Sequence, residues 1–183
     1  MKKLLAALVL LLLITPTFGQ EEERFTLEGK AKLITTWQSK SLKSVDAKLS
    51  SGDAIRIILI PQNDAASIQA YHKNLVADLG EIDYSDDLQD WVVKIYEYDF
   101  DRDGEKELII AKSFDFSFLT VEVYRYSNGL ATRVGNFNAQ FTIILDKNNI
   151  SFPIGSQGYV EEFFYRDGIF YEPVPHNPDN NDQ

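Results

Sequence analysis

The chain has 183 residues, a length that predicts one folded domain able to bury a sizeable core. It contains no cysteine, which excludes disulfides and thiol catalysis. Its formal net charge of −10 argues against nucleic acid and anionic membranes as partners, because both are negatively charged, whereas cations suit such a surface.

The first 19 residues have the pattern of a cleavable signal peptide. Lys2 and Lys3 give a positive start, and an unbroken apolar run follows over residues 4–14. The run is shorter than the roughly 20 residues that a membrane-spanning helix needs. We therefore expect cleavage before Gln20, no membrane insertion afterwards, and a protein exported to the periplasm, the cell surface or the medium.

Strand and helix signals alternate in the first half of the remaining chain. Residues 24–50 give weak signals, with a strand around Leu33–Trp37 and a short helix or loop over residues 41–49. The β-branched run 54–60 ends at Pro61 and predicts a buried strand.

The segment after Pro61 predicts the one main helix. Asn63 or Asp64 is suited to cap its start, and Gly80 stands where a left-handed C-terminal cap belongs. Between them, apolar residues recur at helical spacing, namely Ile68, Tyr71, Leu75 and Leu79.

From Trp91 onward the chain favours strands joined by short turns. Strands are expected over residues 91–100, 108–113, 121–126, 141–145, 150–153, 163–165 and 169–171. Asn128-Gly129 and Asp167-Gly168 are typical of tight hairpins. These signals predict a single α+β domain over residues 20–175, with an antiparallel β-rich sheet, one main helix and a disordered polar tail over residues 176–183.

One acidic loop carries the most specific chemical signal. Over residues 99–108, carboxylates stand at positions 1, 3, 5 and 9, with Gly104 at position 6 for a sharp bend. Calcium prefers six to eight oxygen ligands, and alternate residues of a tight loop can point at one centre. The predicted ligands are the side chains of Asp99, Asp101, Asp103 and Glu107 and the carbonyl oxygen of Glu105. A carboxylate-rich turn without a metal is the alternative, although converging carboxylates then repel each other.

The loop resembles the calcium loops of FG-GAP and VCBS-type repeats, the family of integrin β-propellers. Both place the acidic loop between two strands, and the family pattern is Asp-x-Asp-x-Asp-Gly-x-x-Asp-Leu. An EF-hand fits less well, because Ile110 stands where its bidentate Glu belongs. The match covers only residues 99–108 in a single copy. Two positions depart from the pattern, with Arg102 where Gly is usual and Glu107 in place of Asp.

Other candidate sites carry weaker signals. His72 and His176 lack metal-ligand spacing, and the acidic positions 83, 86, 87 and 90 suit either a second cation or a solvated linker. Glu161 and Glu162 are the candidate acid pair for a glycan hydrolase. Rows of aromatic residues with a spacing of two, at 96–100 and 114–118, suit either a glycan- or protein-binding surface or a buried core.

These patterns together predict an exported, non-enzymatic calcium-binding module in which the ion is structural and which binds another molecule. The alternatives are a small secreted glycan hydrolase that uses acidic residues, or an inhibitor or accessory subunit of another exported enzyme.

Overall fold

Residues that favour strands dominate the chain, and the described residues of its computed structural model form fourteen β-strands. The structure describes residues 24–38, 43–83, 91–113 and 119–173. These residues include no helix, and therefore none that is long and apolar enough to span a membrane.

The strands form three sheets. The central sheet has the order β10-β9-β8-β7-β2 and consists of β2 (Lys32–Gln38), β7 (Val92–Tyr98), β8 (Glu107–Ser113), β9 (Leu119–Ser127) and β10 (Leu130–Ala139). The four-stranded sheet consists of β3 (Lys43–Lys48), β4 (Ala54–Pro61), β5 (Ala65–His72) and β6 (Leu75–Asp83), in chain order. The terminal sheet has the order β1-β11-β12-β13-β14 and consists of β1 (Thr26–Glu28), β11 (Thr142–Asp146), β12 (Asn149–Ile154), β13 (Tyr159–Arg166) and β14 (Ile169–Tyr171).

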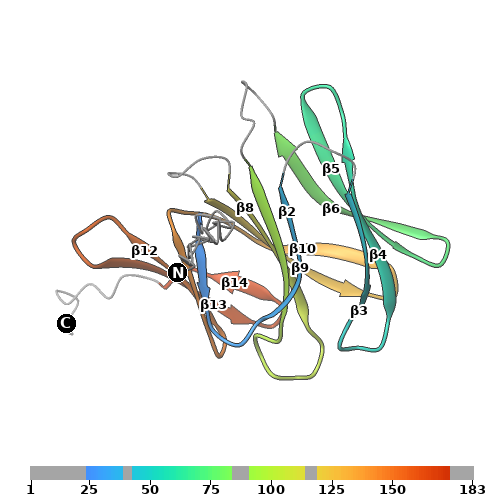
Figure 1. Cartoon of the computed structure of the whole chain (residues 1–183). Coiled ribbons are helices and arrows are strands. Elements are labelled where there is room, and N and C mark those ends of the chain that lie inside the picture. Colours follow the sequence, from blue (N-terminus) through green and yellow to red (C-terminus); the bar gives the residue numbers. More distant parts are fainter. Residues whose placement is uncertain (1–23, 39–42, 84–90, 114–118, 174–183) are drawn as a thin grey trace, which may run out of the picture.

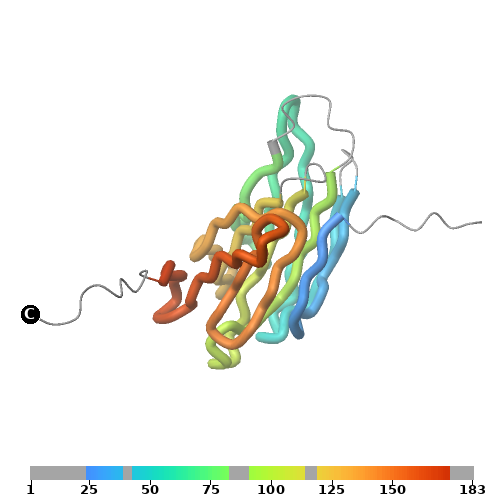
Figure 2. Tube along the Cα trace, turned by 90° about the vertical axis from the view of Figure 1, so that its left-hand side faces the viewer, coloured from blue at the N-terminus to red at the C-terminus, as the bar shows by residue number. Residues whose placement is uncertain are grey.

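The sheets stack as three layers, with the central sheet in the middle (Figure 1). One hydrophobic core lies between the central and four-stranded sheets, and a second lies between the central and terminal sheets. Successive side chains of β8 point to opposite faces, so Ile110 enters the first core and Ile109 the second. Viewed from the side, the terminal sheet lies in front of the other layers (Figure 2).

The predicted α+β class is wrong, because the expected helix is a β-hairpin. Residues 65–72 form β5 and residues 75–83 form β6, and Lys73 turns between them with a φ of 54°. Leu75, expected on the buried stripe of the helix, is 46% exposed. Gly80, expected as a helix cap, lies with a φ of 93° where the β5–β6 register shifts.

Pairing with β4 explains this outcome. β4 is mostly apolar, and β5 supplies it with an antiparallel partner from Arg56 to Pro61. In β5 the alternate residues Ala66, Ile68 and Ala70 are fully buried, a spacing of two that competes with the helical one. Helix propensity is a weak preference that such tertiary pairing overrides. The segment expected as a short helix or loop, residues 41–49, contains strand β3 over residues 43–48.

The strands predicted from Trp91 onward are confirmed, and so are two of their turns. Asn128 and Gly129 have φ values of 52° and 83°, and Asp167 and Gly168 have 53° and 81°, as a two-residue hairpin turn with two left-handed positions requires. Neighbouring strands are antiparallel throughout the described sheets except at β1 and β11, which run parallel.

A buried polar network joins the central sheet to β6. Lys112 Nζ lies 2.7 Å from a carboxylate oxygen of Glu122 and donates to the carbonyl oxygen of Glu81. Arg133 contacts the other carboxylate oxygen at 3.2 Å. Because Lys112 and Glu122 are 4% and 5% exposed, the pair is shielded from water and its charges depend on each other.

Candidate metal site in the β7–β8 loop

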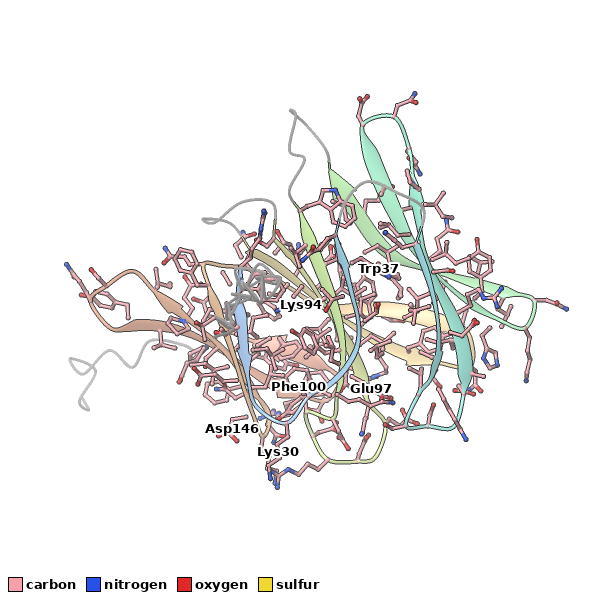
Figure 3. The ribbon with its side chains drawn as sticks, in the orientation of Figure 1. Lys30, Trp37, Lys94, Glu97, Phe100 and Asp146 are labelled. Carbon is pink, nitrogen blue, oxygen red and sulfur yellow. The ribbon has the colours of Figure 1, made fainter. Side chains whose placement is uncertain are left out.

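The acidic loop connects β7 to β8 at one end of the molecule. Figure 3 shows Glu97 and Phe100, which flank the start of the loop, near Lys30 from the β1–β2 connection and Asp146 from the end of β11. A hollow of about 600 Å³ lies here, and Asp99, Arg102 and Lys106 line it beside Lys30 and Asp146. One side of the loop thus faces segments from distant parts of the chain, while residues 102–105 are exposed.

Three of the predicted ligands converge. Asp99, Asp101 and Asp103 each offer a carboxylate oxygen, and these oxygens lie within 4.8 Å of one another. The backbone holds them there, since the Gly104 N–H donates to Asp99 at 3.2 Å and the Glu105 N–H donates to Asp103 at 2.7 Å. Three carboxylates this close repel one another unless a cation balances their charge.

An unsatisfied oxygen supports a fit to a hard cation. The Oδ1 atom of Asp99 is buried and has no hydrogen-bond partner among the described residues. Burying a carboxylate oxygen without a partner costs free energy, and a bound cation would remove that cost. The donor set consists of carboxylate oxygens, which are the ligands that calcium prefers.

The loop backbone is left-handed at Arg102, one of the two positions that depart from the FG-GAP and VCBS-type pattern. Arg102 has a φ of 63°, in the left-handed region that glycine adopts without strain. Arg102 stands where the FG-GAP and VCBS-type pattern usually has Gly. Arg102 is exposed, and it lines the hollow beside Asp99.

Glu107 and Glu105 lie outside the converging group of three. Glu107 is 3% exposed, and its carboxylate accepts the Tyr165 hydroxyl at 2.7 Å and the Phe100 N–H at 3.4 Å. Burial raises the pKa of Glu107 to about 6, and these hydrogen bonds oppose that rise. The side chain of Glu105 is exposed.

Asn148 is a neighbour of the loop that sequence reasoning missed. Its N–H donates to the carbonyl oxygen of Phe100 at 2.8 Å, and its own carbonyl oxygen accepts the Tyr165 N–H. Its side-chain Oδ1 is buried, with no hydrogen-bond partner in the described part of the chain. Nothing in the sequence places Asn148 beside Phe100, because the contact arises only when the terminal sheet packs on the central one.

Glu97 lies at the same end of the molecule as the acidic loop, but it is not one of the converging carboxylates. Glu97 accepts hydrogen bonds from the N–H and hydroxyl of Ser50 at 2.6 and 2.8 Å. Although burial raises the pKa of Glu97, these bonds and the nearby Lys32 outweigh it and lower the pKa below its usual value. Lys106 donates to Ser50, which ties the acidic loop to the β3–β4 turn.

The other sequence candidates are dispersed. His72 is buried on β5, where Nδ1 lies 3.2 Å from the carbonyl oxygen of Ala54. Glu161 and Glu162 are exposed neighbours on β13, so their side chains point to opposite faces of the sheet. The acidic positions 86, 87 and 90, the aromatic row 114–118 and His176 lie outside the described residues.

The aromatic row at 96–100 lies mainly in the core. Tyr96 and Phe100 are 7% and 0% exposed in the core between the central and terminal sheets. Phe100 packs against Tyr165 and Phe170 with ring centroids 5.4 and 5.0 Å apart. These rings therefore pack the two sheets together.

Comparisons of the chain with protein-family models, with curated proteins and with solved structures found no match.

Proposed function

We propose that the protein is an exported, non-enzymatic binding module whose β7–β8 loop holds one structural calcium ion. The observation that carries the proposal is the convergence of carboxylate oxygens from Asp99, Asp101 and Asp103, together with a buried oxygen of Asp99 that has no hydrogen-bond partner in the described residues. The strand–loop–strand setting and the resemblance to FG-GAP and VCBS-type loops point the same way. The signal-peptide pattern supports export from the cytoplasm to a compartment where calcium is plentiful.

The proposed ion has a structural role because of where the loop lies. Asn148 binds the backbone of Phe100, and Tyr165 binds Glu107 at the other end of the loop, so the terminal sheet contacts both ends. A cation that holds the loop carboxylates would therefore stabilise the junction of two sheets. Asn148 Oδ1 is a candidate further oxygen ligand, together with the Glu105 carbonyl and Glu107.

Calcium titration tests the proposal. At calcium concentrations about 100 times the dissociation constant, binding adds roughly 2.7 kcal/mol to the free energy of unfolding. Chelation should therefore lower the melting temperature by several degrees, and calcium should restore it better than magnesium. Isothermal titration calorimetry on the same protein should give one site.

Substitutions assign the ligands. Asp99→Ala is expected to abolish nearly all of the calcium response, and Asp101→Asn to weaken it, because the amide keeps an oxygen but loses the charge. Asn148→Gly removes the candidate oxygen and tolerates the φ of 57° at that position. Asp64→Ala, at an exposed position of the β4–β5 turn, is the control. A wild-type melting temperature indifferent to chelator and to calcium, with no heat of binding, would overturn the proposal.

A further inference from the structure

Exposed apolar side chains concentrate at one end of the terminal sheet. In the described part of the chain, ten large apolar residues are exposed, and five of them lie on the last two strands of this sheet: Tyr159, Val160, Phe164, Ile169 and Tyr171. Phe164 is paired with Tyr171, so these two rings are cross-strand neighbours on the outer face. Beyond them, β14 pairs on one side only within the described chain, which makes it a sheet edge.

β14 differs from the other sheet edges in its lack of charge. The three sheets end in six edge strands, namely β1, β2, β3, β6, β10 and β14. Within the described residues, five of these strands contain at least one charged residue, and β14, with the sequence Ile-Phe-Tyr, contains none. Charged residues normally protect an edge strand from pairing with another chain. β14 is therefore the edge best suited to accept another strand.

The hairpin register shows which backbone groups face the open edge. The two-residue turn at Asp167 and Gly168 makes Arg166 and Ile169 a hydrogen-bonded pair, and such pairs alternate with non-hydrogen-bonded ones. The next pair, Tyr165 and Phe170, is therefore non-hydrogen-bonded. It follows that the N–H and C=O of Phe170 point away from β13, toward the open edge.

We propose that β14 pairs antiparallel with β14 of a second copy about a two-fold axis at Phe170, so that two terminal sheets become one continuous sheet. The two Phe170 residues then exchange a pair of backbone hydrogen bonds, and Ile169 of each copy lies opposite Tyr171 of the other. The apolar outer surface of Phe164, Tyr171 and Ile169 continues across the axis. Such an interface is isologous, since both copies contribute the same surface.

Charge complementarity favours a second copy over an unrelated strand. In this register Glu172 of one copy lies opposite Gly168 of the other. Gly168 faces the central sheet, and a Cβ there would collide with the guanidinium of Arg125. Glu172 is exposed and shares the inward-facing parity of Gly168 and Phe170, so its carboxylate is placed beside Arg125 of the second copy. The pairing thus forms two symmetric ion pairs.

Sedimentation velocity over a range of concentrations tests the proposal on the mature protein. The wild type should show a concentration-dependent dimer. Glu172→Lys should raise the dimer dissociation constant by about tenfold or more, because it places a cation beside Arg125. Glu28→Lys makes the same charge change at the opposite edge of the terminal sheet and should leave the constant within about twofold. A monomer at all concentrations, or equal effects of both variants, would overturn the proposal.

Cysteine cross-linking tests the register. The chain has no cysteine of its own. Ile169 and Tyr171 of the two copies form a non-hydrogen-bonded pair, with Cα atoms about 4.5 Å apart, a spacing that a disulfide accepts. Ile169→Cys and Tyr171→Cys should therefore form a covalent dimer when mixed and oxidised, and neither should do so alone. The register is contradicted if either variant alone cross-links in the same yield as the mixture, or if the mixture does not cross-link.

Discussion

Glu107 has two roles that only the folded chain brings together. Its spacing makes it the ninth position of the candidate calcium loop, and its burial places its carboxylate beneath Tyr165. A carboxylate in this position is costly to ionise when no cation is bound, which is the physical cause of its raised pKa. The same residue therefore links the loop, the central sheet and the terminal sheet.

We predict that Glu107 makes the calcium-free protein less stable as the pH rises. The pKa of its carboxyl is about 6 in the folded state against 4.5 as the reference value, so between these values the folded state binds more protons than the unfolded state. The free energy of unfolding should then fall by about 2 kcal/mol as the pH rises through 4.5 to 6. Glu107→Gln should lose this dependence.

Urea unfolding in chelator at several pH values measures the effect as the difference between wild type and Glu107→Gln. Glu105→Gln removes a charge from the same loop at an exposed position and is expected to keep the wild-type pH dependence. Parallel curves for wild type and Glu107→Gln would show that Glu107 does not titrate in this window.

The β5–β6 hairpin depends on one glycine for its contact with the central sheet. Gly80 has a φ of 93°, and a Cβ there would lie 2.5 Å from a carboxylate oxygen of Glu122 and 2.8 Å from the Tyr124 hydroxyl. Both partners belong to the buried polar network around Lys112. The glycine therefore permits both the backbone conformation and the close approach of β6 to that network.

Comparing Gly80→Ala with Gly52→Ala separates the effect of backbone strain from the effect of the close approach to the polar network. Gly52 has a similar φ of 96° but no atom within 4 Å of its added Cβ. Both variants should be destabilised by backbone strain, and Gly80→Ala by roughly 1–3 kcal/mol more, the usual cost of overpacking. Chemical denaturation gives both values. Equal losses would mean that the network adapts to the extra methyl group.

The three layers should unfold as one unit because the central sheet contributes to both cores. Trp37 and Trp91 are the only tryptophans of the chain, and both lie in the core between the central and four-stranded sheets. Their fluorescence therefore reports on that core alone, whereas far-UV circular dichroism reports on all strands. Adjacent residues of β8 reach one core each, so substitutions there can perturb either core separately.

Ile109→Ala, in the core beneath the terminal sheet, tests this cooperativity. It removes a fully buried side chain and should cost about 2–5 kcal/mol. The tryptophan fluorescence transition should shift together with the circular dichroism transition, although both tryptophans lie in the other core. Ile110→Ala, on the opposite face, is the matched control and should shift both signals as well. A fluorescence midpoint that stays at the wild-type value in Ile109→Ala would show that the layers unfold separately.

The sequence alone determined those features that neighbouring residues decide. The hairpin turns at Asn128-Gly129 and Asp167-Gly168 were predictable because few residues adopt left-handed φ values without strain. The apolar runs of β4, β7, β8 and β9 indicated strands through their composition, and the acidic loop between β7 and β8 was predictable through its spacing. Each of these signals is complete within about ten residues.

Only the tertiary structure decided those features that depend on contacts between segments far apart in the chain. Residues 65–83 carry both a helical and an alternating apolar pattern, and the backbone pairing of β4 with β5 and of β5 with β6 selected the strands. The same holds for the parallel pairing of β1 with β11, for Tyr165 above Glu107, and for Asn148 beside Phe100. In each case the favourable contact joins segments far apart in the chain, so its free energy has no signature in the local order of residues.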